Sequence, residues 1–373
     1  MNELEPPIFI CVGDNPARLF SLSAQERACR LASNAGLECG ERVDHKRAAI
    51  LANMNFAWDP AWLKLIAKRP SSVLIAADGA PVIAHLPAGF PAEAVEQAML
   101  GTSGSLEGLE RIDSQGTEVS YDELRKREKP FVLPLSEDSA DQVERAAYDA
   151  SYKGVTDALT LYLWRKPAFY LTRWAAQAGL TPNAISGFGA LLCVLAFFYF
   201  WFGNYWLGIA VGFVFMVLDT VDGKLARCTG TSSKWGEVLD HGVDLIHPPF
   251  WWWAWAHGLS AYGRPLEPVY EAMLLAAIIG GYVAQRVIEG LFIARFNMHI
   301  HVWRPIDSRF RLVTARRNPN MVILVVALLL GRPDVGLELV ALWTILSLMF
   351  HMLRLAQAEM QAWRGSPPVS WLA

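Results

Sequence analysis

The sequence is poor in cysteine, and its cysteines are not spaced for metal binding. Five occur in 373 residues, none of them in a CxxC pair: Cys11, Cys29, Cys39, Cys193 and Cys228. Because their number is odd and their spacing irregular, we expect neither a disulfide framework nor a zinc site. A reducing compartment is the default expectation.

The sequence also lacks a strong charge of either sign and a recognisable targeting segment. Its 33 Lys and Arg against 36 Asp and Glu leave a net charge of −3, which gives no basis for a nucleic-acid partner. The opening MNELEPPIFI has no basic region before its short apolar run. It is therefore not predicted to be a signal peptide.

Apolar residues are abundant instead. They make up 53% of the chain, and the long apolar runs are concentrated in residues 185–360, whereas residues 1–150 have an ordinary globular composition. Such a shift predicts one soluble and one membrane domain. We place the first at residues 1–145 and the second at residues 146–373.

Six stretches of the second domain are long and apolar enough to cross a membrane as helices of about 20 residues. Residues 160–178 mix Trp, Tyr and Arg with apolar side chains, as an interfacial helix does, although a soluble linker helix is the alternative. The expected fold is an α-helical polytopic membrane protein with six transmembrane helices, an interfacial helix and an N-terminal α/β domain. The predicted spans are 185–203, 205–222, 236–258, 268–293, 319–335 and 336–356.

Positive charge on the loops predicts the orientation. Lys224, Arg227 and Lys234 follow the second span, whereas the loops on the other side hold few positive charges. By the positive-inside rule, the basic loops and both termini face the cytoplasm, which suits a multi-pass protein of the cell (inner) membrane. The loop between the fourth and fifth spans holds Arg295, Arg304, Arg309, Arg311, Arg316 and Arg317.

Residues 219–244, DTVDGKLARCTGTSSKWGEVLDHGVD, place four aspartates beside two apolar runs. Asp219 and Asp222 are three residues apart, so they share a face if their segment is helical. Asp240 and Asp244 are four apart and share a face in the same way. We therefore expect the four carboxylates to converge on the cytoplasmic side, where these two helices meet.

Converging carboxylates at the edge of an apolar layer repel one another and lose hydration. Hard divalent cations such as Mg²⁺, Mn²⁺ or Ca²⁺ relieve both effects. A metal cluster of this kind implies a phosphate-bearing substrate. The alternative is that the aspartates are helix caps and solvated loop residues without a metal.

Residues close to the aspartates fit a phosphate-bearing ligand. Gly223 and Gly236 would let the backbone approach it closely. Arg227 could pair with a phosphate group through its planar guanidinium. His241 and His247 are also near, and we interpret both as packing residues rather than ligands.

The spacing D-x2-D-G-x2-A-R-x8-G-x3-D-x3-D resembles the signature of the CDP-alcohol phosphotransferases. TPNAIS, residues 181–186, is similar to the segment that opens the first span in that family. The signature positions are Asp219, Asp222, Gly223, Ala226, Arg227, Gly236, Asp240 and Asp244.

The resemblance implies a defined reaction. A CDP-linked alcohol binds with its diphosphate on two metal ions, Mg²⁺ or Mn²⁺, an acceptor hydroxyl attacks the β-phosphorus, and CMP leaves. All four aspartates are implied as metal ligands, with Asp240 and Asp244 as catalytic residues and Asp244 as the general base. The implied nucleotide contacts are Gly223, Ala226, Arg227 and Gly236. Membrane lipids and a second copy of the chain are the other expected partners.

The basic segment TARRNPN, residues 314–320, has two interpretations. It either reflects the positive-inside rule alone or lines a pocket for an anionic acceptor such as a phosphorylated polyol. Arg286 in the fourth span favours a pocket, but it could instead form a structural pair with Glu289. The candidate acceptor-binding residues are Arg286, Arg309, Arg311, Arg316 and Arg317.

Residues 8–37 predict a strand, a loop and an amphipathic helix, and residues 62–87 predict a helix followed by two strands. The opening resembles that of sugar nucleotidyltransferases, but the loop GDNPARL lacks the GxGxR spacing of their phosphate cradle. Asp78 is the only plausible metal-binding acid there. We expect a degenerate domain for docking or regulation. Residues 100–130 are interpreted as a polar linker.

The whole layout resembles the family subgroup that carries a nucleotidyltransferase-like domain ahead of the membrane part. The donor would be CDP-diacylglycerol or a CDP-polyol, and the acceptor inositol phosphate or another hydroxyl compound. Two other classes compete. A Mg²⁺-dependent intramembrane prenyltransferase would carry two distant acidic motifs rather than one compact motif, and an ion-coupled transporter often shows internal repeats, which we do not find.

Overall fold

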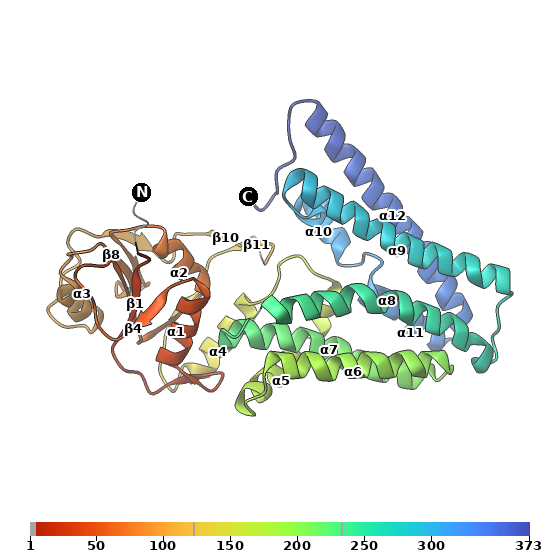
Figure 1. The fold of residues 1–373 in the computed structure, drawn as a ribbon, viewed down its shortest axis with the longest axis horizontal. Coiled ribbons are helices and arrows are strands. Elements are labelled where there is room, and N and C mark those ends of the chain that lie inside the picture. Colours follow the sequence, from red (N-terminus) through yellow and green to blue (C-terminus); the bar gives the residue numbers. More distant parts are fainter. Residues whose placement is uncertain (1–4, 122–123, 233) are drawn as a thin grey trace. The chain divides into compact units, whose positions relative to one another are not determined.

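The computed structural model describes residues 5–121, 124–232 and 234–373 (Figure 1). Its contacts divide the chain into two compact units. The first contains residues 1–152, 172–180 and 223–232, and the second contains residues 153–171, 181–222 and 233–373.

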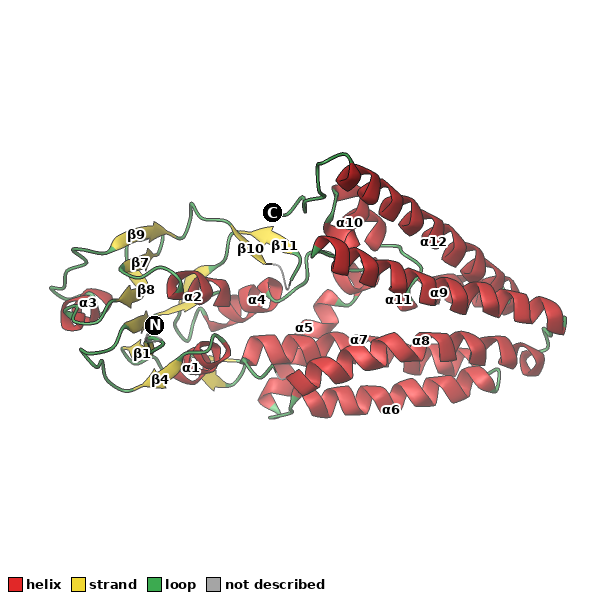
Figure 2. Ribbon diagram, turned by 45° about the horizontal axis from the view of Figure 1, so that its top comes forward, coloured by secondary structure: helices red, strands yellow, loops and turns green. Residues whose placement is uncertain are grey.

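The first unit is built around a six-stranded mixed sheet in the order β4-β1-β5-β8-β7-β9, shown in Figure 2. β1 is parallel to β4 and β5, and β7 is parallel to β9, whereas β8 is antiparallel to both β5 and β7. The strands of this sheet are β1 (Ile8–Val12), β4 (Glu38–Gly40), β5 (Ala49–Asn53), β7 (Ser72–Ile75), β8 (Pro81–Leu86) and β9 (Glu110–Asp113). Short pairs join β2 (Arg18–Leu19) to β3 (Leu22–Ser23), β6 (Phe56–Trp58) to β12 (Val132–Pro134), and β10 (Val119–Tyr121) to β11 (Lys126–Glu128).

Helices of this unit start where a side chain can cap them. Ser23 accepts a hydrogen bond from the Glu26 backbone amide at the start of α1, and Asp59 caps α2 in the same way just before Pro60. Every residue of β5 and β8 is buried, which places the core in the middle of the sheet. The helices are α1 (Ala24–Asn34), α2 (Pro60–Ala67), α3 (Ala92–Met99) and α4 (Ala140–Ala150).

The structure confirms the predicted strand, loop and helix in residues 8–37 and the helix with two strands in residues 62–87. The interpretation of residues 100–130 as a polar linker is wrong. Glu110–Asp113 forms β9, which pairs with β7 at the edge of the main sheet. Only one residue of this short strand, Ile112, is buried, so its sequence carries little apolar signal.

The three N-terminal cysteines lie together, which corrects the expectation of no disulfide. Cys29 of α1 and Cys39 of β4 form a disulfide, and Cys11 Sγ lies 4.0 Å from Cys29 Sγ. Phe9 of β1 is in register with Cys39, so Cys11, two residues on, points to the same face of the sheet. Spacing along the sequence cannot reveal this arrangement, because strand pairing creates it.

The second unit is helical. Figures 1 and 2 show α6, α7 and α8 running side by side, and α9 beside α12. Its elements are a π-helical turn, η1 (Leu159–Leu163), and the helices α6 (Pro182–Trp201), α8 (Lys234–Tyr262), α9 (Pro268–Phe296), η2 (Ile300–Val302), α10 (Pro305–Arg311), α11 (Arg317–Leu329) and α12 (Pro333–Trp363). Two helices, α5 (Arg165–Gln177) and α7 (Tyr205–Thr229), continue from this unit into the first.

Four helices in the described part of the chain are long and apolar enough to cross a membrane: α6, α7, α9 and α12. They match the first, second, fourth and sixth predicted spans. α11 is a shorter apolar helix of 13 residues, about 20 Å long against a hydrocarbon layer of about 30 Å. The multi-pass prediction is confirmed, while the count of six spans stays a prediction.

The predicted interfacial segment is helical and exposes aromatic side chains. Tyr162, Tyr170 and Trp174 are exposed on η1 and α5, and Arg165 and Lys166 belong to the same stretch of sequence. A helix that combines exposed aromatic rings with basic residues fits the boundary between lipid and water.

A pair of prolines lies within α8, close in sequence to the aspartate motif. Pro248 and Pro249 have no N–H groups, so the carbonyls of Asp244 and Leu245 lose their partners within the helix. The Tyr282 hydroxyl of α9 lies within hydrogen-bond distance of both carbonyls, at 3.4 Å from Asp244 O and 3.0 Å from Leu245 O. A neighbouring helix therefore supplies one hydroxyl donor that the two carbonyls share.

Candidate functional site

Two motif aspartates from different helices meet at one guanidinium. Arg317, the first residue of α11, donates from Nη2 to Asp219 Oδ2 of α7 and from Nη1 to Asp244 Oδ1 of α8, each at 2.8 Å. The guanidinium also lies 5.0 Å from the centre of the Phe215 ring, which helps to fix its orientation. The predicted convergence of these two carboxylates is thus present in the structure.

Arg317 indicates what kind of ligand the two carboxylates suit. Its side chain is 11% exposed, that of Asp219 15% and that of Asp244 47%. The guanidinium is a cation bound by carboxylate oxygens in a mostly buried position. The two carboxylates therefore form a site that can bind a positive charge. Oxygen donors of this type suit Mg²⁺ or Mn²⁺, and the residues present therefore fit a divalent ion.

The other two aspartates of the motif are Asp222 and Asp240. Asp222 is buried, and its carboxylate accepts a hydrogen bond from the Ser186 hydroxyl of α6. Asp240 lies on α8, but its side chain is outside the described part of the structure. Sequence reasoning missed Ser186 as a partner, although the TPNAIS segment that contains it was noted.

The histidines next to the motif behave as the sequence suggested, as far as they are described. His247 is buried, and its ring lies edge-on to Phe215 and Trp251, with centroids 5.1 and 5.0 Å away. Its Nδ1 donates to the Val243 carbonyl at 2.6 Å. His247 is therefore a packing residue, whereas the side chain of His241 lies outside the described part.

The glycine and arginine half of the motif lies at the end of α7, in the first unit. Arg227 Nε donates to the Ser151 carbonyl at 3.1 Å. A Cβ atom on Gly223 would come within 3.0 Å of Arg227 Nη2, so glycine leaves room for this guanidinium. Ala226 lies on the same part of α7, and Gly236 lies on α8 in the second unit.

Two acceptor candidates share one carboxylate. Glu289 of α9 contacts Arg286 Nη2 at 2.7 Å and Arg316 Nη2 at 2.6 Å. His301 Nε2 lies 3.1 Å from the same carboxylate. The structural pair considered for Arg286 is therefore present, and Arg316 joins it.

The surroundings of Glu289 carry an excess of positive charge. Among the described residues, two arginines, Arg286 and Arg316, form ion pairs with the one carboxylate of Glu289. Burial holds the pKa of His301 well below its usual range, so this ring adds no charge near neutral pH. His351 is 1% exposed, and neither ring nitrogen has a hydrogen-bond partner among the described residues. The cluster thus offers donors to an anion more readily than ligands to a cation.

Arg309 and Arg311 have different surroundings in the structure. Arg309 is exposed, whereas Arg311 is buried and its positive charge interacts with the Asp157 carboxylate. Burial would raise the Asp157 pKa, but the Arg311 charge and hydrogen bonds from Asn318 and Thr160 outweigh it and leave the pKa lowered. Asp157 and Asn318, 2.9 Å apart, link the segment before η1 to α11, a contact that no sequence pattern pointed to.

In the first unit, the loop after β1 uses its polar groups internally. Asn15 Nδ2 donates to the carbonyls of Met54 and Leu135 at 2.9 Å, and Asn15 Oδ1 accepts the Ala17 amide. Asp78 accepts the Ala80 amide at 3.0 Å, as a turn residue does.

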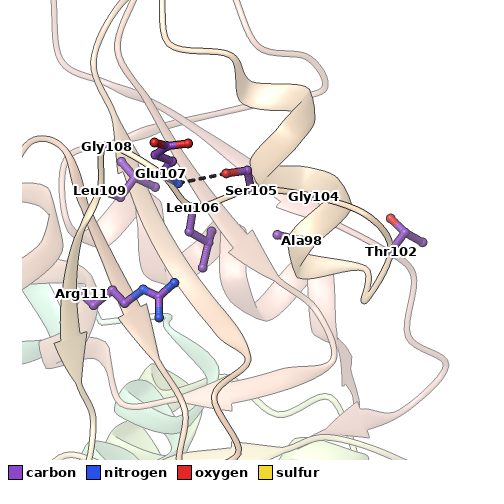
Figure 3. A pocket seen from close by; sticks show the side chains of 9 residues that line it. All are labelled: Ala98, Thr102, Gly104, Ser105, Leu106, Glu107, Gly108, Leu109 and Arg111. Atoms are coloured by element: carbon purple, nitrogen blue, oxygen red, sulfur yellow. Dashed lines mark hydrogen bonds between the residues drawn. The ribbon is translucent and has the colours of Figure 1, made fainter.

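An open pocket of about 620 Å³ lies in the first unit, within residues 98–111 (Figure 3). Thr102, Glu107 and Arg111 line it, and Ser105 Oγ accepts the Glu107 amide at 3.2 Å. It belongs to the segment interpreted as a linker and contains no residue singled out from the sequence.

Comparisons with known proteins match the part of the chain that carries the aspartate motif. A family model described as CDP-alcohol phosphatidyltransferase matches residues 179–354. Cholinephosphotransferase 1 of Gallus gallus is 33% identical over 134 residues, which cover 32% of this chain and 38% of the relative.

Two synthases are also similar to this chain, with comparable sequence identity. Archaetidylinositol phosphate synthase of Pyrococcus horikoshii is 35% identical over 82 residues, 22% of this chain and 44% of the relative. Phosphatidylinositol phosphate synthase of Mycolicibacterium smegmatis is 31% identical over 112 residues, 27% of this chain and 50% of the relative. The chain therefore spans half or less of the length of these curated relatives.

Proposed function

Because residues 179–354 belong to the CDP-alcohol phosphatidyltransferase family, we propose that this chain is a membrane phosphotransferase of phospholipid or phosphodiester biosynthesis. It transfers a substituted phosphate from a CDP-linked alcohol to an acceptor hydroxyl and releases CMP. The observation that carries this proposal is the meeting of Asp219 and Asp244 at the Arg317 guanidinium. Two carboxylates that already hold a positive charge between them suit a bound divalent ion.

The aspartates have distinct proposed roles. Asp244 is the most exposed of the motif aspartates whose side chains are described, so it can reach an acceptor hydroxyl and take its proton. Asp240, four residues earlier on α8, is the second proposed catalytic residue. Bound divalent ions would neutralise charge on the diphosphate and on the departing CMP. The proposed ligands of two Mg²⁺ or Mn²⁺ ions are Asp219, Asp222, Asp240 and Asp244.

The donor nucleotide is proposed to bind at the glycine and arginine half of the motif. Glycine and alanine leave space for the cytidine, and the Arg227 guanidinium can pair with a phosphate oxygen. The proposed contacts are Gly223, Ala226, Arg227 and Gly236. The donor itself is a CDP-alcohol, either CDP-diacylglycerol or a CDP-polyol.

The acceptor is proposed to be a hydroxyl compound with an anionic group, such as inositol phosphate or another polyol phosphate. The positive excess around Glu289 supports this, with Arg286 and Arg316 as the best supported contacts. Arg309, Arg311 and Arg317 stay in the proposed set with weaker support. Arg309 is exposed, while Arg311 faces Asp157 and Arg317 faces the aspartates.

We propose a six-span inner-membrane protein, active as a homodimer, with the site and both termini in the cytoplasm. Residues 1–145 are proposed to form a degenerate nucleotidyltransferase-like domain. The internal use of Asn15 and Asp78 supports this, because such groups would otherwise be available to a nucleotide. Docking or regulation is its proposed role.

Release of CMP tests the function directly. The purified chain in detergent should release CMP from a CDP-alcohol when an acceptor and Mg²⁺ or Mn²⁺ are present, and EDTA should stop it. The control is the same preparation without acceptor. Turnover of a prenyl diphosphate, or ion flux without CMP, would instead favour the two other classes.

Arg316→Gln should raise the acceptor KM by roughly 10- to 100-fold and leave the donor KM within about twofold, because one charge-assisted contact to an anion is worth about 1.5–3 kcal/mol. Steady-state kinetics with each substrate varied in turn measures both values. Arg295→Gln is the matched control, since it removes the same charge from an exposed position outside the proposed acceptor site. Equal acceptor KM values in the two variants would mean that this basic loop serves topology alone.

A further inference from the structure

Three of the five cysteines form one cluster in the first unit. The sulfur atoms of Cys11, Cys29 and Cys39 all lie within 4.8 Å of one another. They come from a strand, a helix and a second strand, and all three residues are half-buried. The other two cysteines, Cys193 and Cys228, are buried in α6 and α7.

We propose that Cys11, Cys29 and Cys39 form a three-thiolate site for a divalent cation of the Zn²⁺ class, which the Cys29–Cys39 disulfide closes. This site is separate from the aspartate motif and does not depend on the proposed function. Sulfur ligands prefer softer ions than carboxylates do, so the two sites differ in the metals they select.

Sulfur separations support the cation. Zinc binds thiolates at about 2.3 Å with tetrahedral angles, which puts neighbouring sulfurs about 3.8 Å apart. Cys11 and Cys29 are already 4.0 Å apart. The Cα atoms of Cys29 and Cys39 are 5.6 Å apart, so rotation about their Cα–Cβ bonds can separate these two sulfurs once the disulfide opens.

The third thiol distinguishes this cluster from a simple disulfide. A disulfide needs two sulfurs, yet Cys11 lies beside the bonded pair. Because the residues are half-buried, an ion can reach them from solvent. No His, Asp or Glu completes this group among the described residues, so the fourth position would take water or a small external ligand.

Opening the site is a two-electron reduction. A dithiol reductant gives two electrons and two protons, the Cys29–Cys39 bond breaks, two thiols form, and the reductant becomes a disulfide. Binding of the divalent ion then releases the protons of the three thiols. A thiol-reducing compartment would keep the site open, and oxidation would close it.

The cluster also lies next to contacts within the same unit that reach the end of α7. Arg30, which follows Cys29 on α1, donates to the Thr229 carbonyl at 3.4 Å. Asn34 Nδ2 donates to the Gly230 carbonyl at 3.0 Å. Cys29 therefore lies on the same helix, α1, whose side chains bind the end of α7, and opening the disulfide removes the covalent link of that helix to β4.

Cobalt binding tests the site. The full-length chain in detergent is reduced with a dithiol, the dithiol is removed without oxygen, and Co²⁺ is added in steps. We expect thiolate-to-cobalt charge-transfer absorption that saturates at about one equivalent and disappears when Zn²⁺ is added. Carboxylate-bound Co²⁺ lacks this absorption, so binding at the aspartate motif does not contribute.

Variants and the oxidised protein make the test decisive. Cys11→Ser and Cys39→Ser should each weaken Co²⁺ binding by roughly a hundredfold, while the control Cys193→Ser should leave it unchanged. The disulfide form should show no such absorption, and three rather than five thiols should react after denaturation. Absence of the absorption in the reduced chain, its persistence in Cys11→Ser, or its presence in the disulfide form would overturn the proposal.

Discussion

Asparagine in place of Asp244 should lower kcat by about 10²- to 10⁴-fold while the protein still folds and enters the membrane. The amide keeps the size of the side chain and can still accept a hydrogen bond from Arg317 Nη1. It removes the negative charge and the basic oxygen that the proposed proton transfer needs. Initial rates of CMP release at saturating substrates and Mg²⁺ measure the effect, and elution as a single species in detergent checks folding.

A second aspartate–arginine pair in the same unit provides the control. Asp334 contacts Arg332 at 2.7 Å at the start of α12, and its side chain is 13% exposed. Asp334→Asn should leave kcat within about twofold of the original, because neither Asp334 nor Arg332 belongs to the aspartate motif or to the proposed acceptor site. We expect Asp240→Asn to lower kcat by about the same factor as Asp244→Asn. Near-normal activity in either variant would remove that aspartate from the catalytic machinery.

Arg317→Gln should destabilise the metal-free protein and make its stability strongly dependent on Mg²⁺. Without the guanidinium, the carboxylates of Asp219 and Asp244 face each other with no positive charge between them. Breaking a buried ion pair costs about 3–5 kcal/mol, and because Asp244 is 47% exposed we expect about 1–3 kcal/mol here. Added Mg²⁺ should recover most of this loss, because it supplies the missing charge.

Thermal unfolding in detergent, with and without Mg²⁺, measures this effect as a change in Tm. The matched control is Arg295→Gln, which removes an arginine from an exposed pair with Glu359 at 3.3 Å. Mg²⁺ should raise the Tm of Arg317→Gln several degrees more than that of the control. If Mg²⁺ shifts both variants equally, the two aspartates do not hold the ion.

The convergence of Asp219 and Asp244 could be predicted because it follows from local periodicity. Each aspartate pair recurs at helical spacing next to an apolar run, and both runs had to be helical in a membrane. The partner of the carboxylates could not be predicted in the same way. Arg317 was one of several arginines in a basic loop, and only the three-dimensional packing of α11 against α7 and α8 selects it.

Long-range pairing accounts for most of what the sequence analysis missed. The disulfide between Cys29 and Cys39 depends on which strand lies beside β1, which spacing along the chain does not reveal. The edge strand Glu110–Asp113 looked like a linker because three of its four residues are exposed. The hydrogen bond from the Ser186 hydroxyl to Asp222 could not be predicted either, because it depends on the packing of α6 beside the motif.

The proline pair in α8 has a consequence for how the proposed base is controlled. Its backbone carbonyl is held by the phenol of Tyr282, which belongs to another helix, because Pro248 and Pro249 cannot supply that donor. A backbone carbonyl without a donor is unfavourable where water cannot reach it, so this hydrogen bond couples the two helices at this point. Because α9 holds α8 at the residue proposed as the base, any displacement of α9 along α8 would shift the backbone that carries the Asp244 carboxyl group.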